Sequence, residues 1–228
     1  MIKLCVFDLD GTLLDTVPDL TAAMNYAMHK TGHGEITAED TRAYIGNGIK
    51  MYAKRAMSGS CDTDTPDAEA DVAVKYFKEY YATHLINGTT PYPDITKLLV
   101  RLKNDGIRLA VLSNKYDAAA KHIINHFFPG LFDCIYGESE ICKRKPDISG
   151  FMLICRDTGC TPAEAVMIGD APTDLNVAKN AGASSVSVSW GYRSRAVLEE
   201  AGAAVFADDA DELYDIITSL QESIRKRS

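Results

Sequence analysis

The sequence contains no C-x-x-C pair, although six cysteines are spread over its 228 residues. Cysteines scattered in this way match neither the ligand spacing of a zinc site nor the framework of a small disulfide-bonded domain. The apolar run after Lys3 is interrupted at once by Asp8, a layout unlike that of a secretory signal peptide. We therefore expect reduced thiols in a cytoplasmic protein. The cysteines are Cys5, Cys61, Cys134, Cys142, Cys155 and Cys160.

Basic residues are in deficit, because 24 lysines and arginines stand against 32 aspartates and glutamates, and the formal net charge is −8. A chain of this charge lacks the basic surface that nucleic acid requires. The sequence also lacks an apolar stretch long enough to span a membrane. We therefore expect no nucleic-acid or membrane partner. An anionic ligand would have to be held locally, by a metal ion, a lysine or helix N-termini.

Short apolar segments rich in β-branched residues predict the strands of a sheet. They lack the alternation of apolar and polar residues that marks a half-exposed strand, so they suit a parallel sheet covered on both faces. Helical patterns separate the later segments, which is typical of a doubly wound α/β domain. The predicted strands are 4–7, 108–112, 134–136, 166–168, 185–188 and 204–206, and the predicted helices are 94–105, 115–128, 148–158, 173–181, 195–201 and 211–224.

The region 16–88 interrupts this pattern, because it follows the first strand and contains no convincing strand of its own. Apolar residues recur at helical spacing from Leu20 to Met28, and further helical patterns follow. An insertion of this length is too long for a simple crossover connection. We therefore predict an α/β fold with a doubly wound parallel-sheet (Rossmann-like) core, residues 1–15 and 89–228, and an inserted α-helical cap domain, residues 16–88.

Two carboxylates stand at the end of the first predicted strand. Asp8 and Asp10 are two residues apart, so in an extended backbone their side chains point the same way. Two acids held together at the end of a buried strand repel each other unless a cation or a proton lies between them. The pattern predicts a Mg²⁺ site in which one carboxylate can act as a nucleophile and the other can move a proton.

Further polar groups follow the carboxyl ends of other predicted strands, where open α/β sheets bind their ligands. They are Ser113 and Asn114 after the second strand, where they are expected to open a helix, Lys145 after the third, and Asp170 and Asp174 after the fourth. Taken singly, these residues are consistent with helix caps, helix-start acids or an exposed basic loop. Their common position at one sheet edge predicts a single site.

With these motifs in this order, the sequence resembles the haloacid dehalogenase superfamily in its phosphatase branch, over essentially the whole chain. The resemblance implies a Mg²⁺-dependent phosphatase in which Asp8 is the nucleophile that becomes an aspartyl-phosphate. It implies that Asp10 protonates the leaving oxygen and then deprotonates the hydrolytic water, while Lys145 neutralises charge on the nucleophile and the phosphate. A halide leaving group needs no proton, so the second aspartate argues against halide displacement.

The resemblance also implies the ligands of the phosphate and the metal. Ser113 and the backbone amide of Asn114 would bind phosphoryl oxygens, and Asp170 would hold Mg²⁺ together with Asp8 and the backbone carbonyl of Asp10. These roles agree with the physics of phosphoryl transfer, in which positioning and charge neutralisation supply most of the catalysis.

The segment after Asp170 departs from the family at one position. Ala171 stands where family members usually carry a hydroxyl residue, so a hydrogen bond is lost or comes from Thr173. Asp174, in the same segment, is implied to support the metal or Lys145 from nearby.

Residues 44–50 of the inserted region carry a closer resemblance. Two glycines around Asn47 break the helical pattern and let the backbone approach a ligand. Together with the segments 91–93, 113–115 and 189–192, this region resembles the phosphoglycolate phosphatase group, whose substrate is a small phosphate ester that also bears a carboxylate. The resemblance implies Asn47, Gly48 and Lys50 as substrate contacts, by charge and amide hydrogen bonds. The loop is equally consistent with a plain interhelical turn.

Other functions on the same scaffold stay open. Related caps accept sugar phosphates or pyrophosphate, and a phosphomutase would retain the phosphoryl group. A non-catalytic binding protein would be expected to lose Asp8, Asp10 or Lys145, and all three are present. We expect Mg²⁺ as the cofactor, a small phosphorylated metabolite as the partner, and a monomer or homodimer.

Overall fold

The computed structural model describes the backbone of residues 1–225 and the side chains of residues 1–220. The chain forms two compact units, one made of Met1–Leu14 and Pro91–Ser228, the other of Asp15–Thr90. We call the first the core unit and the second the helical unit. None of the described helices combines the length and the apolar character that a membrane span requires.

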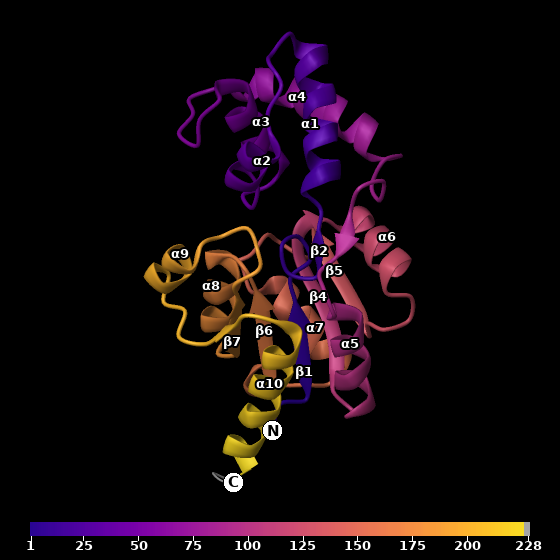
Figure 1. Cartoon of the computed structure of the whole chain (residues 1–228), viewed down its shortest axis with the longest axis vertical. Coiled ribbons are helices and arrows are strands. Elements are labelled where there is room, and N and C mark those ends of the chain that lie inside the picture. Colours follow the sequence, from indigo (N-terminus) through magenta and orange to yellow (C-terminus); the bar gives the residue numbers. More distant parts are fainter. Residues whose placement is uncertain (226–228) are drawn as a thin grey trace. The chain divides into compact units, whose positions relative to one another are not determined.

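A six-stranded parallel sheet forms the centre of the core unit (Figure 1). Its order, β5-β4-β1-β6-β7-β8, places the first strand in the middle and lets the later strands extend away from it in both directions. This arrangement confirms the predicted doubly wound fold. The strands are β1 (Leu4–Phe7), β4 (Arg108–Tyr116), β5 (Cys134–Glu138), β6 (Ala165–Gly169), β7 (Ser184–Val188) and β8 (Phe206–Ala207).

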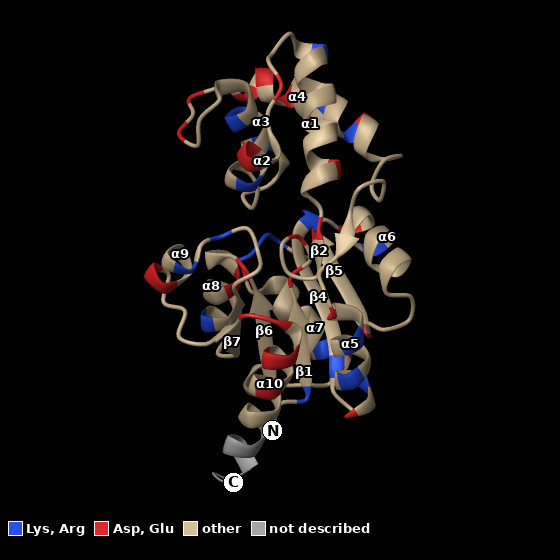
Figure 2. Ribbon diagram, in the orientation of Figure 1, with Lys and Arg blue, Asp and Glu red and all other residues tan. Residues whose placement is uncertain are grey.

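Helices cover both faces of this sheet. On one face α5 contacts α10, and on the other α7 contacts α8 (Figure 1). Arg101 of α5 donates to Asp211 of α10 at 2.6 Å, and its guanidinium carbon lies 3.7 Å from the centre of the Tyr214 ring. Figure 2 shows basic residues on α5 and acidic residues at the start of α10. The helices of the core unit are α5 (Ile95–Asn104), α6 (Asp117–Phe127), α7 (Ser149–Thr158), α8 (Pro172–Ala181), α9 (Arg195–Glu200) and α10 (Ala210–Arg225), with a 3₁₀ turn, η1, at Pro162–Glu164.

Strand β1 is buried on both faces, and all four of its side chains are inaccessible to solvent. Leu4 and Val6 pack in a cluster with Phe151 of α7, and Phe7 meets Phe132 edge to face at 6.3 Å. Burying a large apolar side chain stabilises a fold by about 1.5–3 kcal/mol, so this strand anchors the sheet. The residues that follow β1 are therefore held in a fixed position.

Strand β4 is longer than the sequence predicts. The expectation that Ser113 and Asn114 end the strand and open a helix is wrong, because β4 continues to Tyr116 and α6 begins at Asp117. Pairing with β5 is irregular between Leu112 and Tyr116. The polar residues of this stretch are typical helix caps, but the strand continues through them and pairs with β5 again at Tyr116.

The helical unit contains four helices, and α1 packs against α4 at its centre. Tyr52, Phe77 and Tyr81 form an aromatic cluster in its interior. Thr37 and Asp40 form a reciprocal capping box at the start of α2, which fixes where that helix begins. The helices are α1 (Val17–Thr31), α2 (Ala38–Tyr44), α3 (Ile49–Ser58) and α4 (Asp67–Tyr81).

The chain passes between the two units within β2 (Leu14–Asp15) and β3 (Thr90–Pro91), which pair in a two-stranded sheet. The sequence does not predict these strands, since each is only two residues long.

Asp19, near the start of α1, binds the last residues of the helical unit. Its buried carboxylate accepts hydrogen bonds from the backbone N–H of Gly88 at 2.8 Å, from the N–H of Thr89 at 2.8 Å and from the Thr89 hydroxyl at 2.7 Å. A side chain on Gly88 would collide with Pro18. The segment leaving the helical unit is thus fixed to the segment that enters it.

We expect Asp19→Ala to lower the free energy of unfolding of the helical unit by about 2–4 kcal/mol, because it leaves buried N–H groups without their charged acceptor. Chemical denaturation followed by circular dichroism would measure the loss. Asp19→Asn keeps one acceptor oxygen and should lose less. An Asp19→Ala variant as stable as the wild type would contradict this account.

Candidate active site

Asp8 follows directly on β1 and is the centre of a buried cluster. Its N–H donates to the carbonyl of Ile168 at 2.9 Å, which continues the pairing of β1 with β6. Its carboxylate accepts from the N–H of Leu9 at 2.7 Å and pairs with the Lys145 ammonium at 2.8 Å. The strand end therefore fixes the carboxylate in front of a buried cation.

Lys145 reaches this cluster from the loop after β5, and its side chain is 1% exposed. The ammonium also pairs with Asp174, at the start of α8, at 2.6 Å. Asn114 of β4 holds the backbone of the lysine on both sides. Its Oδ1 accepts from the Lys145 N–H at 2.6 Å and its Nδ2 donates to the Lys145 carbonyl at 3.3 Å. The sequence did not reveal this bracket, because it joins residues 31 positions apart.

Asp170 follows β6 and is held by two donors. The Thr12 hydroxyl donates to one carboxylate oxygen at 3.0 Å, and the backbone N–H of Tyr192 donates to the other at 2.8 Å. Gly11 and Gly191 pack directly against it, since a Cβ on either would lie 2.4 Å or less from an Asp170 atom. These contacts fix Asp170 without a hydroxyl residue at position 171.

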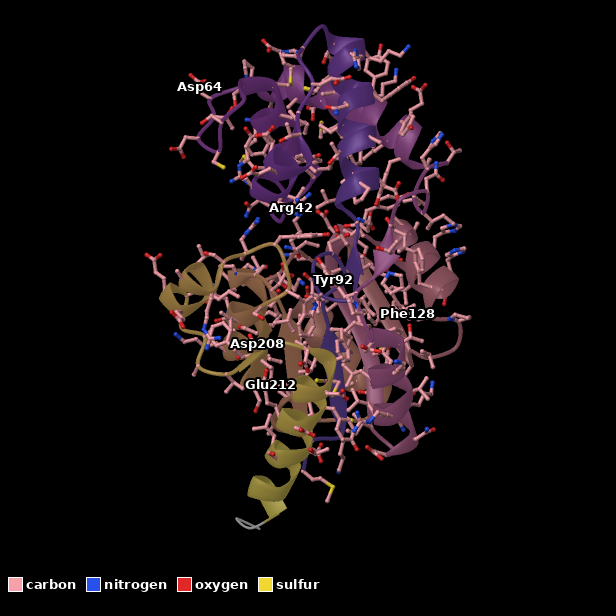
Figure 3. All side chains as sticks on the ribbon, in the orientation of Figure 1. Arg42, Asp64, Tyr92, Phe128, Asp208 and Glu212 are labelled. Atoms are coloured by element: carbon pink, nitrogen blue, oxygen red, sulfur yellow. The ribbon has the colours of Figure 1, made fainter. Side chains whose placement is uncertain are left out.

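The segment after β7 is itself tied to the turn after β1. The indole Nε1 of Trp190 donates to the carbonyl of Thr12 at 3.1 Å, and the Tyr92 ring, labelled in Figure 3, lies 6.4 Å from the Trp190 ring. Asp170 is therefore held by two segments that are hydrogen-bonded to each other.

Three buried carboxylates share this cluster. Ligand oxygens of Asp8, Asp170 and Asp174 all lie within 4.8 Å of one another. The Lys145 ammonium pairs with two of these three acids, so the cluster has an excess of negative charge. Closely spaced carboxylate oxygens are the donors that Mg²⁺ prefers. The residues thus suit a divalent cation.

The charge excess also appears in the proton affinities. Burial raises the pKa of Asp8 to about 8, against the opposing effect of Lys145, and the charges of Asp174 and Asp170 add to the rise. Burial, followed by the charge of Asp174, raises the pKa of Asp170 to about 6. Burial by itself would lower the pKa of Lys145, but Asp174 and Asp8 outweigh it and hold the pKa above its usual value.

Asp10 lies outside that group of three carboxylates and has a different partner. Both of its oxygens accept from the ammonium of Lys115, at 2.9 and 3.2 Å. Lys115 lies in the same extension of β4 as Ser113, whose buried hydroxyl oxygen accepts from the Lys115 N–H at 3.2 Å. The sequence offered no sign of this ion pair, because its members are 105 residues apart.

The candidate substrate residues of the insertion lie in the helical unit. Lys50 pairs with Asp71 at 2.7 Å and with Asp67 at 3.6 Å. The side-chain oxygen of Asn47 accepts from Arg55 at 2.9 Å. Gly48, with a φ of 84°, precedes α3 in a conformation that favours glycine. Contact of Asn47, Gly48 and Lys50 with substrate stays a prediction.

The family model described as "Haloacid dehalogenase-like hydrolase" matches residues 5–188. The chain therefore belongs to the haloacid dehalogenase-like hydrolases.

Relatives with names and solved structures extend this assignment. The chain is 33% identical over 219 residues to phosphoglycolate phosphatase 1 of Pseudomonas aeruginosa, covering 94% of this chain and 78% of the relative. It is 35% identical over 208 residues to a phosphoglycolate phosphatase of Mesorhizobium japonicum, covering 89% of each. A crystal structure from Lactobacillus delbrueckii subsp. bulgaricus, of a protein assigned as a phosphoglycolate phosphatase, superimposes with a TM-score of 0.88 at 35% identity, covering 94% of this chain and 98% of that one.

We expect Mg²⁺ to stabilise the protein more at pH 8 than at pH 6. Because the pKa values of Asp8 and Asp170 are raised, the folded protein binds more protons than the unfolded chain between about pH 4 and pH 8. Stability without metal therefore falls as the pH rises through this range, and bound Mg²⁺ offsets the repulsion. Thermal unfolding with EDTA or Mg²⁺ measures the difference, which Asp170→Asn should reduce. An increase in Tm independent of pH would contradict this expectation.

We expect Gly191→Ala to weaken Mg²⁺ binding by about tenfold or more, because groups that orient a ligand typically contribute 10- to 100-fold to metal affinity. The new Cβ would lie 2.1 Å from the Asp170 Cβ, so the carboxylate must move. Isothermal titration with Mg²⁺ measures the affinity. Gly34→Ala, at a position with open space around it, is the matched control and should bind like the wild type.

Proposed function

We propose that this hydrolase removes phosphate from small phosphate monoesters, with 2-phosphoglycolate as the preferred substrate, through a phosphorylated Asp8. The buried Asp8–Lys145–Asp174 arrangement beside Asp170 is the observation that carries this proposal. The names of relatives about one third identical support the choice of substrate.

Asp8 and Asp170 would offer carboxylate oxygens to a Mg²⁺ ion, with the backbone carbonyl of Asp10 as a further ligand, and Asp174 would support the site from nearby through Lys145. When bound, the ion supplies positive charge that lets a carboxylate approach a phosphate dianion. The protein itself keeps the three acids fixed and buried, so that a cation rather than solvent compensates their negative charge.

Asp8 is the nucleophile in this proposal. Its carboxylate forms a bond to phosphorus while the bond between phosphorus and the ester oxygen breaks. Lys145 contacts the same carboxylate and neutralises charge on the nucleophile and on the transferring group. Asp174 keeps the ammonium in place from the opposite side.

Asp10 moves the protons. It donates a proton to the ester oxygen as the alcohol leaves, and then removes a proton from the water that attacks the phosphorus of the aspartyl-phosphate. The products are the alcohol and inorganic phosphate, and Asp8 is regenerated.

Ser113 and the backbone N–H of Asn114 bind phosphoryl oxygens in this proposal. The buried hydroxyl of Ser113 lies in the same extension of β4 as Asn114. The Asn114 side chain has a separate task, because it brackets the backbone of Lys145.

The helical unit is proposed as the cap that excludes water and selects substrates. Asn47, Gly48 and Lys50 would contact the substrate carboxylate. Because Lys50 pairs with Asp71 and Asp67, binding substrate would require it to exchange one of these partners. Because the protein has a net charge of −8, a small anionic substrate would need local positive charge, such as that of Lys50, to bind.

The same core chemistry would serve a sugar phosphatase, a pyrophosphatase or a phosphomutase, and only the contacts that select the substrate differ. We place the protein in the cytoplasm, as a monomer or homodimer.

We expect the purified protein with Mg²⁺ to release phosphate from 2-phosphoglycolate with a higher kcat/KM than from hexose phosphates, nucleotides or pyrophosphate. Chelation of the metal should abolish turnover, and Asp8→Asn should lower kcat by at least about a thousandfold, because the covalent route is lost.

A phosphate-release assay over this panel, with a parallel assay for isomerised product, separates the possibilities. Preference for a hexose phosphate would change the substrate but keep the reaction. Turnover that survives both chelation and Asp8→Asn would overturn the mechanism.

A further inference from the structure

We propose that Lys115 is a positioning residue that holds the carboxyl group of Asp10 in place for the second half of the reaction, the attack of water on phosphorylated Asp8. This inference rests on the proposed function. Lys115 lies in the segment 113–115 that contributes to the resemblance, but neither the resemblance nor the mechanism above gives it a role.

The contact between the two side chains is close and sheltered. The Lys115 ammonium donates to both oxygens of Asp10, at 2.9 and 3.2 Å, and the lysine side chain is only 6% exposed. An exposed ion pair of two long side chains contributes little, because solvent screens it and either partner can swing away. A sheltered ammonium bound to both carboxylate oxygens instead restricts the carboxylate to one orientation.

The backbone that carries Lys115 is itself fixed. The Ser113 hydroxyl oxygen accepts from the Lys115 N–H at 3.2 Å. On β5, Gly137 packs against the same stretch so closely that a Cβ there would lie 2.5 Å from the Lys115 carbonyl oxygen. The N–H of Gly137 donates to the Asp117 carboxylate at 3.1 Å, just beyond the lysine. The irregular extension of β4 is thus anchored on both sides of Lys115.

The cluster around Asp8 has a lysine of its own. Lys145 already pairs with Asp8 and Asp174, whereas Lys115 pairs with Asp10, which lies outside that group. The two lysines therefore divide the acids between them. One serves the carboxylate that carries the phosphoryl group, and the other serves the carboxylate that moves the proton.

The second half-reaction depends on where the Asp10 oxygens lie, and Lys115 contacts both of them. A carboxylate can accept a proton from water only if it lies within hydrogen-bond reach of that water. A misplacement of about 1 Å can lower a rate by about a hundredfold. Without Lys115, we expect Asp10 to sample other orientations and the phosphorylated enzyme to hydrolyse more slowly.

Single-turnover kinetics with 2,4-dinitrophenyl phosphate test this step. Its leaving group departs without a proton, so the release of dinitrophenolate reports the phosphorylation of Asp8 and the release of inorganic phosphate reports its hydrolysis. For Lys115→Met we expect dinitrophenolate release within about threefold of the wild type and phosphate release 10- to 100-fold slower, with phosphorylated enzyme accumulating.

Two comparisons isolate the pair. Lys97→Met removes an exposed lysine of α5 that pairs with Asp94, the residue before the helix, and this variant should match the wild type in both phases. In an Asp10→Asn background, Lys115→Met should slow phosphate release no further, because the proposed role of Lys115 is exerted through Asp10. If Lys115→Met does not show the wild-type circular dichroism spectrum, Lys115→Gln replaces it in every comparison.

Three results would overturn the proposal. In the first, Lys115→Met lowers the rates of dinitrophenolate release and phosphate release by the same factor. In the second, phosphate release from the variant is as fast as dinitrophenolate release. In the third, Lys115→Met slows phosphate release equally in the wild-type and Asp10→Asn backgrounds. A wild-type enzyme that releases neither product from any phosphate ester would instead overturn the proposed function.

Discussion

The mutual repulsion of three buried carboxylates around one lysine is the constraint on which the rest of the core unit depends. Asp8, Asp170 and Asp174 would separate if the chain around them could yield, so each is held by donors or by close packing. The backbone at Gly11 and Gly191 approaches so closely that no side chain fits there. Rigidity at this edge is the means by which a charge excess is kept ready for a cation.

The fold divides this work among elements that are fixed to one another. The central strand carries Asp8 at its end, its neighbour β6 carries Asp170, and β4 supplies Asn114 and Lys115 from the other side. Because these strands are adjacent in one sheet, their ends cannot move independently. Asn114 of β4 binds the backbone of Lys145. The sheet therefore also fixes the position of Lys145, although this residue lies in a loop.

Local pattern was enough to predict the sheet and the grouping of acids at its edge. The apolar run 4–7 reads as a buried strand, and the ends of parallel strands must lie at one edge, so Asp8 and Asp170 were placed by topology. Local pattern was not enough for β4, whose polar end resembles a helix start. Nor could it show which donor meets which acid, because the partners of Asp10 and Asp170 come from distant parts of the chain.

The central place of β1 in the sheet affects the order in which parts of the protein can fold during synthesis. Its sheet partners, β4 and β6, lie far behind it in the chain, so during synthesis the first strand leaves the ribosome long before either exists. The residues of the helical unit come next and contact mainly one another, which allows them to fold early. In the growing polypeptide, Asp8 therefore has neither Lys145 nor strand β6 beside it until those later segments have been translated.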